Sequence, residues 1–429
     1  MGFEGDGGCL LPGPMKRETE VKPVQPVKPW EGVRPVSKRI FFYTGSFTHT
    51  LYKQQFSHPP AGTVYIPSST ELLAPQAIRQ DFRTRDRWWF RPVVQAKHAA
   101  LSVPKRLGMV NLRRLNRPDC DLIHSAQYLL LSKNRWVIDF EDASVFTWYS
   151  RAGQSRPWAR RMVRRRLEDP RCRWILPWTN AARLSLLNAF DCFHLAHKIK
   201  VVHPAIDPKP LPEADRLGRR ACNVLFVGTI FYEKGGWETL LACERVARHQ
   251  NLHLTMVTYA PRDVLASYAA RKFVSFRKNV SQQELDSLYR SADVFVYPAH
   301  TDTFGFVLLE AMSYGIACIG SRHFAIPEIL DEDKSGLLVE VEVSRFGPDG
   351  VPRYEPITGP KHPMMALLRQ PSETLVESLV AAIARLAENV DLRTQLARSG
   401  YEETLDGRFS FRHRNQLLSE CYLNALEEG

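Results

Sequence analysis

Residues 292–315 read ADVFVYPAHTDTFGFVLLEAMSYG. The apolar run 294–297 has the composition of a buried strand, and Pro298, which cannot donate to a sheet ladder, ends it. Residues 301–303 are Thr-Asp-Thr, which are all helix-capping types, so a helix is predicted to begin near Phe304–Gly305. A buried strand that passes through a short loop into a helix is the repeating unit of a parallel α/β sheet.

Strands and helices are predicted to alternate in this way over most of the chain. The apolar runs lie at KRIFFY (38–43), DLIHSAQYLLL (121–131), RWVIDFEDA (135–143), CRWILPW (172–178), KIKVVHPAID (198–207), NVLFVGTI (223–230), HLTMVTYA (253–260), KFVSF (272–276), ADVFVYPA (292–299), GIACIGS (315–321) and GLLVE (336–340). Helical stretches such as NAARLSLLNAF (180–190) separate them. We therefore predict an α/β protein with two Rossmann-like, doubly wound domains that face each other across a ligand-binding cleft.

Breaks in this alternation define the predicted domain boundaries. Residues 1–37 are rich in Pro, Gly and Lys and are expected to form a disordered lead-in. The N-terminal domain is predicted to span 38–206, and the C-terminal domain 207–405, beginning with a Pro-rich linker. Within the second domain, residues 343–371 contain several Pro and Gly residues and are expected to form an inserted loop. The final segment, 406–429, is predicted to be a helix.

Positive charge is concentrated in the first half of the chain. Residues 1–206 hold 33 Lys and Arg against 16 Asp and Glu, a balance of +17, whereas residues 207–429 hold 25 against 30, a balance of −5. This asymmetry indicates that the first domain meets an anionic partner. Charge alone does not choose among nucleic acid, a membrane surface and a phosphorylated acceptor.

The most basic stretch is RPWARRMVRRRLEDPRCRW, residues 156–174. Arginines recur in it at helical spacing between Trp158 and Leu167. Three interpretations stay open: a solvated helix face, an interfacial helix that meets anionic lipid headgroups between Arg156 and Arg173, and a nucleic-acid surface. No stacking platform or recognition helix accompanies it, so no nucleic acid is expected. The similar segment RTRDRWWFR (83–91) favours a surface that carries a lipid-linked acceptor.

Several classes of protein are disfavoured by composition. No apolar run approaches the ~18 residues of a membrane span. The first twenty residues lack a basic segment followed by an apolar one, so no signal peptide is predicted. Eight cysteines are scattered singly without a CxxC pair, which argues against a zinc site and fits a reducing compartment. We expect a cytoplasmic protein, peripheral on a membrane if the basic helix binds lipid.

A second motif, FVGTIFYEKGGWETLL (226–241), joins a predicted strand to a helix through glycines and a lysine. The strand ends at Gly228, and Lys234 and Gly235 precede the helix. Backbone N–H groups, a helix dipole and a lysine charge together suit a phosphate. The spacing is neither that of a P-loop nor GxGxxG, so an ordinary turn with a solvated lysine stays open.

Asp302 and Glu310 are the two acids of the opening stretch. Both would serve as hydrogen-bond acceptors for sugar or ribose hydroxyls, and the N–H groups of Phe304, Gly305 and Phe306 would face a ligand at the sheet end. The alternative is that Asp302 only caps the helix and that Glu310 is an ordinary exposed helix residue.

The order and spacing of these motifs resemble those of family-4 retaining glycosyltransferases with the GT-B fold. The resemblance covers roughly residues 222–340 and includes Gly228, the Lys234–Gly235 pair, DTFGFVLLEAMSYG (302–315) and IPEIL (326–330). It implies that the final helix crosses back over the N-terminal domain.

The resemblance also implies a role for each residue of the donor site. Glu310 would bind the ribose hydroxyls of the nucleotide, and Lys234 its diphosphate. Asp302 and the N–H groups from Thr303 to Phe306 would hold the sugar. The site would need neither a metal nor a cofactor, because the lysine and the helix N-termini neutralise the leaving diphosphate.

Two residues depart from the family pattern in the C-terminal domain. Thr229 stands where the family has a basic residue, typically Arg, so another cation, Arg322 or one from the N-terminal domain, would have to replace it. Asp302 stands where the family has Glu. It keeps the charge with a shorter reach.

The N-terminal domain resembles the family less closely. Its first strand ends at Gly45 alone instead of a Gly-Gly pair. Glu141 takes the place of a His near the sugar, followed by Asp142, and either acid could contact a sugar hydroxyl, activate an acceptor or merely cap a helix. Thr179 is expected to cap a helix in the cleft, and His124 lies at a predicted strand end where a structural role is the alternative to catalysis.

Together with the resemblance, these observations predict a glycosyltransferase that moves a sugar from a UDP- or GDP-linked donor to a hydroxyl acceptor, a glycan or a lipid-linked sugar. The resemblance implies that configuration is retained. Asp302, Lys234 and Glu141 are the expected catalytic residues. A nucleotide-sugar-binding protein with little or no turnover is the alternative, and a basic nucleic-acid binder is the third hypothesis.

Overall fold

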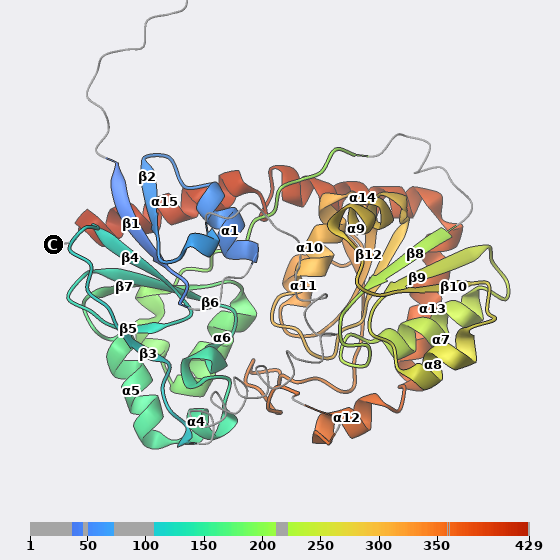
Figure 1. Ribbon diagram of the computed structural model, residues 1–429, viewed down its shortest axis with the longest axis horizontal. Helices are drawn as coiled ribbons and strands as arrows, with labels where there is room; N and C mark the ends of the chain where they lie inside the picture. The colour runs from blue at the N-terminus through green and yellow to red at the C-terminus, as the bar shows by residue number, and fades with distance from the viewer. Residues whose placement is uncertain are drawn as a thin grey trace, which may run out of the picture. The chain divides into compact units, whose positions relative to one another are not determined.

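The computed structural model describes residues 37–45, 50–72, 107–211, 222–357, 359 and 361–427 (Figure 1). The expected lead-in before Ser37 and the Arg- and Trp-rich segment 83–91 lie outside the described residues. Residues 37–429 belong to one compact unit, and it contains two parallel sheets with helices packed against them.

The first sheet has the strand order β2-β1-β4-β6-β7 and is parallel throughout. Its strands are β1 (Lys38–Tyr43), β2 (Thr63–Pro67), β4 (Leu122–Ala126), β6 (Trp136–Phe140) and β7 (Cys172–Pro177). Every residue of β4 and β6 is buried, because both faces of these central strands are covered. The strand order reverses between β1 and β4, which is a topological switch point.

In the described part of the first domain, short helices and one further strand pair accompany this sheet. They are α1 (Thr50–Ser57), α4 (Arg151–Ser155), α5 (Pro157–Leu167), α6 (Asn180–Phe190), the 3-10 turns η1 (Thr70–Leu72), η3 (Ala143–Thr147) and η4 (Phe193–Lys198), and the parallel pair β3 (Leu112–Arg114) and β5 (Leu129–Leu131). Helix α5 starts with a proline at its first position and buries Ala159, Val163 and Leu167, one residue per turn.

The second sheet has the order β10-β9-β8-β11-β12-β13 and is also parallel. Its elements in chain order are β8 (Cys222–Val227), α7 (Gly236–Val246), β9 (Leu252–Val257), α8 (Arg262–Tyr268), β10 (Val274–Arg277), α9 (Gln282–Ser291), β11 (Val294–Tyr297), α10 (Phe306–Ser313), β12 (Ala317–Ser321), α11 (Ile326–Ile329) and β13 (Gly336–Val339). The order reverses between β8 and β11, so the loops that follow these two strands start side by side.

Four helices follow the second sheet: α12 (Pro363–Leu368), α13 (Glu373–Glu388), α14 (Val390–Leu405) and α15 (Phe411–Glu427). Ser372 and Asn389 cap α13 and α14 through their side-chain oxygens. Helix α13 packs on α7, and α14 packs on α10. Buried apolar residues such as Leu379 on α13 and Leu396 on α14 lie on these two helices.

Helix α15 returns to the first domain and packs on β4 and β7 (Figure 1). The hydroxyl of Tyr422 hydrogen-bonds to His124 Nδ1 at 2.6 Å and to the hydroxyl of Tyr65 at 3.0 Å. Arg414 Nη2 donates to the carbonyl of His58 at 2.8 Å. The last helix is therefore tied to the first domain by buried polar contacts as well as by apolar packing.

The structure differs from the sequence prediction in several elements. The run 121–131 is divided into β4 and β5, because Gln127 takes the left-handed conformation with φ of 67°. The run 198–207 is not a regular strand. The backbone N–H groups of Lys200 and Val202 donate to β7, but Pro204 has no N–H with which to continue the ladder. Strands β2 and β3 were not predicted, and the predicted inserted loop contains helix α12.

Replacing Tyr422 with Phe is expected to lower stability by about 1–3 kcal/mol, because His124 Nδ1 and the Tyr65 hydroxyl would both lose a buried partner. The urea midpoint of unfolding measures this change. Tyr401→Phe, at a half-buried tyrosine of α14, is the matched control and is expected to leave the midpoint unchanged. Equal midpoints for Tyr422→Phe and Tyr401→Phe would contradict a stabilising role of the Tyr422 hydroxyl.

Candidate active site

The switch point of the second sheet brings two loops together. Gly235, after β8, has φ of +73°, and a Cβ atom at this position would lie 2.3 Å from the carbonyl oxygen of Pro298, after β11. Only glycine fits such a contact. At Gly228 a Cβ would lie 2.9 Å from the Cβ of Lys234. The two glycines therefore allow the Lys234 side chain to reach the loop that follows β11.

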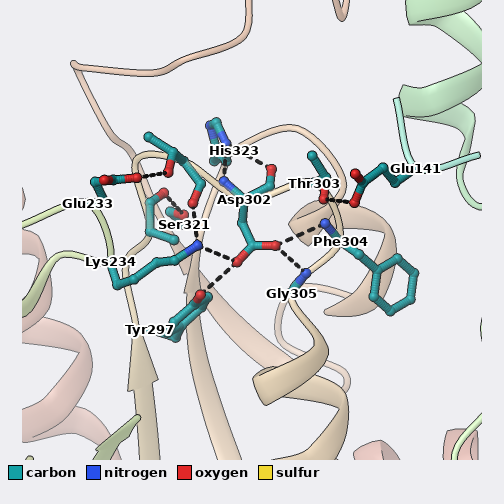
Figure 2. Close-up of polar contacts among 12 residues, drawn as sticks. Glu141, Glu233, Lys234, Tyr297, Asp302, Thr303, Phe304, Gly305, Ser321 and His323 are labelled. Atoms are coloured by element: carbon teal, nitrogen blue, oxygen red, sulfur yellow. Dashed lines mark hydrogen bonds and ion pairs between the residues drawn. The ribbon is translucent and has the colours of Figure 1, made fainter. Parts of the chain in front are cut away.

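Lys234 and Asp302 form a half-buried ion pair at the centre of this region (Figure 2). The ammonium donates to Asp302 Oδ2 at 2.8 Å and to the carbonyl of Thr301 at 2.6 Å. Tyr297 donates its hydroxyl to the same carboxylate oxygen at 2.6 Å. Lys234, predicted as a phosphate ligand, thus already has two oxygen partners in this structure.

The other carboxylate oxygen of Asp302 caps the chain just before α10. Oδ1 accepts from the N–H groups of Phe304 at 3.0 Å and Gly305 at 2.8 Å. Two of the N–H groups that were expected to face the donor sugar are therefore bonded to Asp302. Helix α10 begins at Phe306, one to two residues later than the predicted start near Phe304–Gly305, and Gly305 precedes it with φ of +99°.

These contacts determine the charge state of Asp302. Burial by itself raises the pKa of this carboxyl, but the Lys234 charge and the hydrogen bonds from Lys234, Tyr297 and Phe304 outweigh it and hold the pKa well below its ordinary value. Asp302 is therefore a carboxylate at neutral pH.

His323, which the sequence analysis did not select, supports the same loop. Its Nε2 lies 3.0 Å from the backbone N–H of Asp302, and its Nδ1 lies 2.8 Å from Ser344 Oγ. Accepting from an N–H requires an unprotonated Nε2, so we assign the neutral tautomer with the proton on Nδ1. Burial lowers the pKa of His323 to about 3. No motif marked this histidine, because its role depends on the tertiary contact with Asp302.

Glu141 connects the first domain to this cluster. Its two oxygens accept from the hydroxyls of Thr303 at 2.7 Å and Tyr149 at 2.6 Å. Burial and the neighbouring charge of Asp142 raise the pKa of Glu141, although the two hydrogen bonds oppose this rise. The structure therefore brings together Glu141, Thr303, Asp302 and Lys234, although Glu141 and Lys234 are far from Thr303 and Asp302 in the sequence.

The other candidates from the first domain lie elsewhere. Asp142 and Thr179 cap η3 and α6 through Ser144 N–H at 2.7 Å and Ala182 N–H at 3.1 Å. His124 belongs to the contact between β4 and α15, with Nε2 3.3 Å from Asp139 Oδ2 but without hydrogen-bond geometry.

Gly45 lies at the end of β1 with φ of +63°, where a Cβ would meet the ring of Tyr128 at 2.6 Å. Among the described residues, no hydrogen bond or ion pair joins Gly45, His124, Asp142 or Thr179 to Lys234 or Asp302. The structure therefore does not gather these four residues around the ion pair.

The remaining donor-site candidates are on the second sheet. Glu310 Oε2 accepts from the hydroxyl of Tyr289 at 3.0 Å, and its side chain is half-buried. Thr229 is half-buried directly after Gly228. Arg322, the suggested replacement cation, is bonded in exposed ion pairs to Glu332 and Glu340, so its charge is already paired in this structure.

Within the described ranges, no group of three or more His, Cys, Asp or Glu side chains is placed to hold a metal ion. No helix in this part of the chain is both long and apolar enough to cross a membrane.

Residues 220–345 match the family described as glycosyl transferases group 1. The chain is 26% identical over 243 residues to the D-inositol 3-phosphate glycosyltransferase of Corynebacterium jeikeium, covering 51% of this chain and 54% of that protein. It is 29% identical over 147 residues to the glycogen synthase of Mycobacterium tuberculosis, covering 33% and 36%. The chain thus spans about half, or less, of the length of these curated relatives.

Solved structures match over almost the whole chain. A glycosyltransferase from Rickettsia africae has a TM-score of 0.56 at 12% identity, covering 92% of this chain and all of that one. HepE from Anabaena, solved in complex with UDP-glucose, has a TM-score of 0.52 at 12% identity and covers 90% and 99%. Likenesses at this identity show the fold, and the predicted GT-B arrangement of two Rossmann-like domains is confirmed.

The neutral state of His323 predicts how stability depends on pH. Its pKa rises from about 3 in the folded chain to about 6.5 on unfolding, so between these values the unfolded state binds one more proton. Stability is therefore expected to fall as pH drops below about 6.5, by up to ~1.4 kcal/mol per pH unit from this group.

The variant His323→Gln keeps an acceptor for the Asp302 N–H and removes the titration. The free energy of unfolding, measured from pH 7 to 4, is expected to decline less steeply in this variant than in the wild type. His249→Gln, at an exposed histidine, is the control and should follow the wild type. Parallel wild-type and His323→Gln profiles would rule out a buried neutral His323.

Proposed function

We propose that the protein is a glycosyltransferase that moves a sugar from a nucleotide diphospho-sugar to a hydroxyl acceptor. The observation that carries the proposal is the Lys234–Asp302 pair, which lies at the switch point of the second sheet. This sheet falls within residues 220–345, which match glycosyl transferases group 1. The donor is UDP- or GDP-linked, the configuration is retained, and no metal takes part.

The leaving diphosphate is stabilised by Lys234 and by the start of α10. Lys234 bonds to Asp302 and the Thr301 carbonyl in this structure, and its flexible chain lets it turn from these oxygens to the phosphates. The lysine charge favours departure of the diphosphate, because its attraction to the leaving oxygens strengthens as negative charge builds up on them.

Glu141 and Asp302 lie on the two sides of the transferred sugar. Asp302 is an ionised acceptor for sugar hydroxyls. Glu141, whose pKa burial raises, is suited to exchange a proton with a hydroxyl, because a carboxyl with a raised pKa is a better base. Its bond to Thr303 across the domains places this carboxyl beside the loop that holds Asp302.

A panel of UDP, GDP and ADP in a thermal-shift measurement identifies the nucleotide, because a ligand that binds only the folded chain raises its melting temperature. Labelled donors of that nucleotide are then incubated with glycan and lipid-linked acceptors. Sugar transfer or donor hydrolysis supports the proposal. Saturable binding with neither, for every donor tried, would replace it with the nucleotide-sugar-binding alternative.

Glu310→Ala is expected to weaken nucleotide binding, because Glu310 is proposed to accept two hydrogen bonds from the ribose. Each charge-assisted bond contributes roughly 1.5–3 kcal/mol, so the loss of both weakens Kd by about a hundredfold or more. Titration calorimetry with the nucleoside diphosphate measures it. Glu284→Ala on the exposed side of α9 is the control. An unchanged affinity in folded Glu310→Ala would refute the ribose assignment.

We also propose that helix α5 rests on an anionic membrane that carries the acceptor. Trp158 and Met162 are 46% and 38% exposed, and Arg161 and Arg165 are exposed on the same helical stripe. Across the described residues neither arginine has an ion pair, whereas Arg164 is paired with Asp191. Large apolar side chains between free arginines suit the boundary between lipid headgroups and acyl chains.

The double variant Arg161→Gln/Arg165→Gln is expected to bind anionic vesicles about thirtyfold more weakly, from ~1 kcal/mol per basic residue near the surface. Co-sedimentation with vesicles that contain or lack phosphatidylserine measures this. Arg248→Gln/Arg262→Gln, at exposed positions of the second domain, is the matched control. Binding to random duplex DNA at physiological salt, with none to vesicles, would support a nucleic-acid surface instead.

A further inference from the structure

Arg345 is a buried arginine to which the proposed donor site assigns no role. It lies six residues after the end of β13, and only 7% of its surface is exposed. Its Nε and Nη2 atoms make no hydrogen bond with any of the described residues. A buried N–H without a partner loses the solvation that it had in water, so buried guanidinium groups are normally paired.

The local structure holds this guanidinium in place. The N–H of Arg345 donates to the carbonyl of His300 at 3.1 Å, and its carbonyl accepts from Arg353 at 2.7 Å. The guanidinium carbon lies 4.8 Å from the ring centroid of Phe346, which itself stacks on Phe324 at 4.0 Å. A group that is fixed in advance loses little freedom when it binds a ligand.

The segment around Arg345 joins the two domains. Glu355 accepts from the backbone N–H of Arg151 at the start of α4, at 2.7 Å. The side chain of Asn188 on α6 donates to the carbonyl of Asp349 at 2.8 Å. Arg345 thus lies on a segment, 345–355, that contacts two helices of the first domain.

Arg345 is also close to the acids of the candidate site. Burial raises the pKa of Glu141 and of Glu233, and the charge of Arg345 opposes that rise in both. His300, to which Arg345 is bonded, precedes Asp302 by two residues. The guanidinium therefore lies within electrostatic reach of the residues that surround the Lys234–Asp302 pair.

Neither Glu141 nor Glu233 accepts a hydrogen bond from the Nε and Nη2 atoms of Arg345. Both oxygens of Glu141 accept from hydroxyls, and Glu233 Oε2 accepts from Thr301 Oγ1 at 2.9 Å. The Nε and Nη2 atoms form one side of the planar guanidinium, with two parallel N–H bonds. This spacing matches two oxygens of a carboxylate or a phosphate.

We propose that Arg345 binds an oxyanion of a substrate, a carboxylate or a phosphate, through its Nε and Nη2 edge on the segment that joins the two domains. The assignment to a substrate rests on the proposed transferase function. The oxyanion belongs either to the transferred sugar, as in a uronate, or to the acceptor, as in a sugar phosphate. Arg345 then selects charged over neutral substrates.

The test measures binding of three probes to the full chain: inorganic phosphate, and the neutral and uronate forms of one nucleotide sugar, UDP-glucose and UDP-glucuronate for a uridine site. The variants are Arg345→Met, which removes the charge, and Arg345→Lys, which keeps the charge and loses the paired N–H edge. Arg353→Met, at an exposed arginine eight residues away on the same segment, is the matched control.

If the oxyanion is on the sugar, Arg345→Met is expected to bind the uronate donor about tenfold to a hundredfold more weakly and the neutral donor unchanged. If it is on the acceptor, the phosphate affinity falls by this factor and both donors bind as in the wild type. Arg345→Lys should show a smaller loss of the same selectivity, which keeps the test decisive if Arg345→Met does not fold. Arg353→Met should match the wild type.

The inference is overturned if folded variants bind all three probes as the wild type does, or if they lose the neutral donor as much as the charged one. It is also overturned if the wild type binds neither phosphate nor the uronate. Failure of every nucleotide sugar to bind the wild type would refute the proposed function alone, because the phosphate arm still decides whether Arg345 binds an oxyanion.

Discussion

The close approach of Gly235 to the Pro298 carbonyl is the constraint on which the candidate site depends. It brings the loop after β8 onto the loop after β11 and lets Lys234 reach Asp302 at 2.8 Å. The pair is costly to bury, and it persists because Tyr297 and two backbone N–H groups share the carboxylate. The result is a loop with a fixed conformation directly before α10.

This loop is supported from three directions. His323, which follows β12, accepts from the backbone N–H of Asp302. The hydroxyls of Thr301 and Thr303 donate to Glu233 and, from the first domain, Glu141. Each contact uses a different group, so the loop has its hydrogen-bonding capacity largely filled by protein. A ligand that needs Lys234 must therefore exchange with oxygens already bonded to it.

Polar contacts join the two domains, in addition to the packing of α15 on the first domain. Glu328 of α11 accepts from the N–H groups of Asn180 and Ala181 at the start of α6, both at 2.7 Å. A carboxylate at a helix N-terminus is favourable because the dipole and the free N–H groups both attract it. Together with Glu141 and the segment around Arg345, this contact fixes the surfaces that would face a substrate from both sides.

Much of the architecture was evident from the sequence. Apolar runs bounded by Gly and Pro predicted both parallel sheets, and capping residues placed α10 to within two residues. These signals are local, because burial on two faces and the N–H groups of a helix end impose requirements on consecutive residues. The prediction that Lys234 and Asp302 share one site rested on the motifs that carry the family resemblance, and the two side chains meet in the structure.

Other features had no local signal. The pattern did not reveal that Asp302 would be bonded to four donors, that His323 would support its backbone, or that the side chain of Arg345 would be buried with an unpaired edge. Nor did it distinguish Glu141, which joins the cluster, from His124, which binds α15.

The sequence alone therefore determined the order of most strands and helices, without β2, β3 and α12, and the chemical types of residue at their ends. The tertiary structure decided which of those residues meet, because partners such as Glu141 and Thr303 are 162 positions apart. Their contact depends on how the two sheets pack and on how the loops between them close. No local pattern of residues encodes that packing.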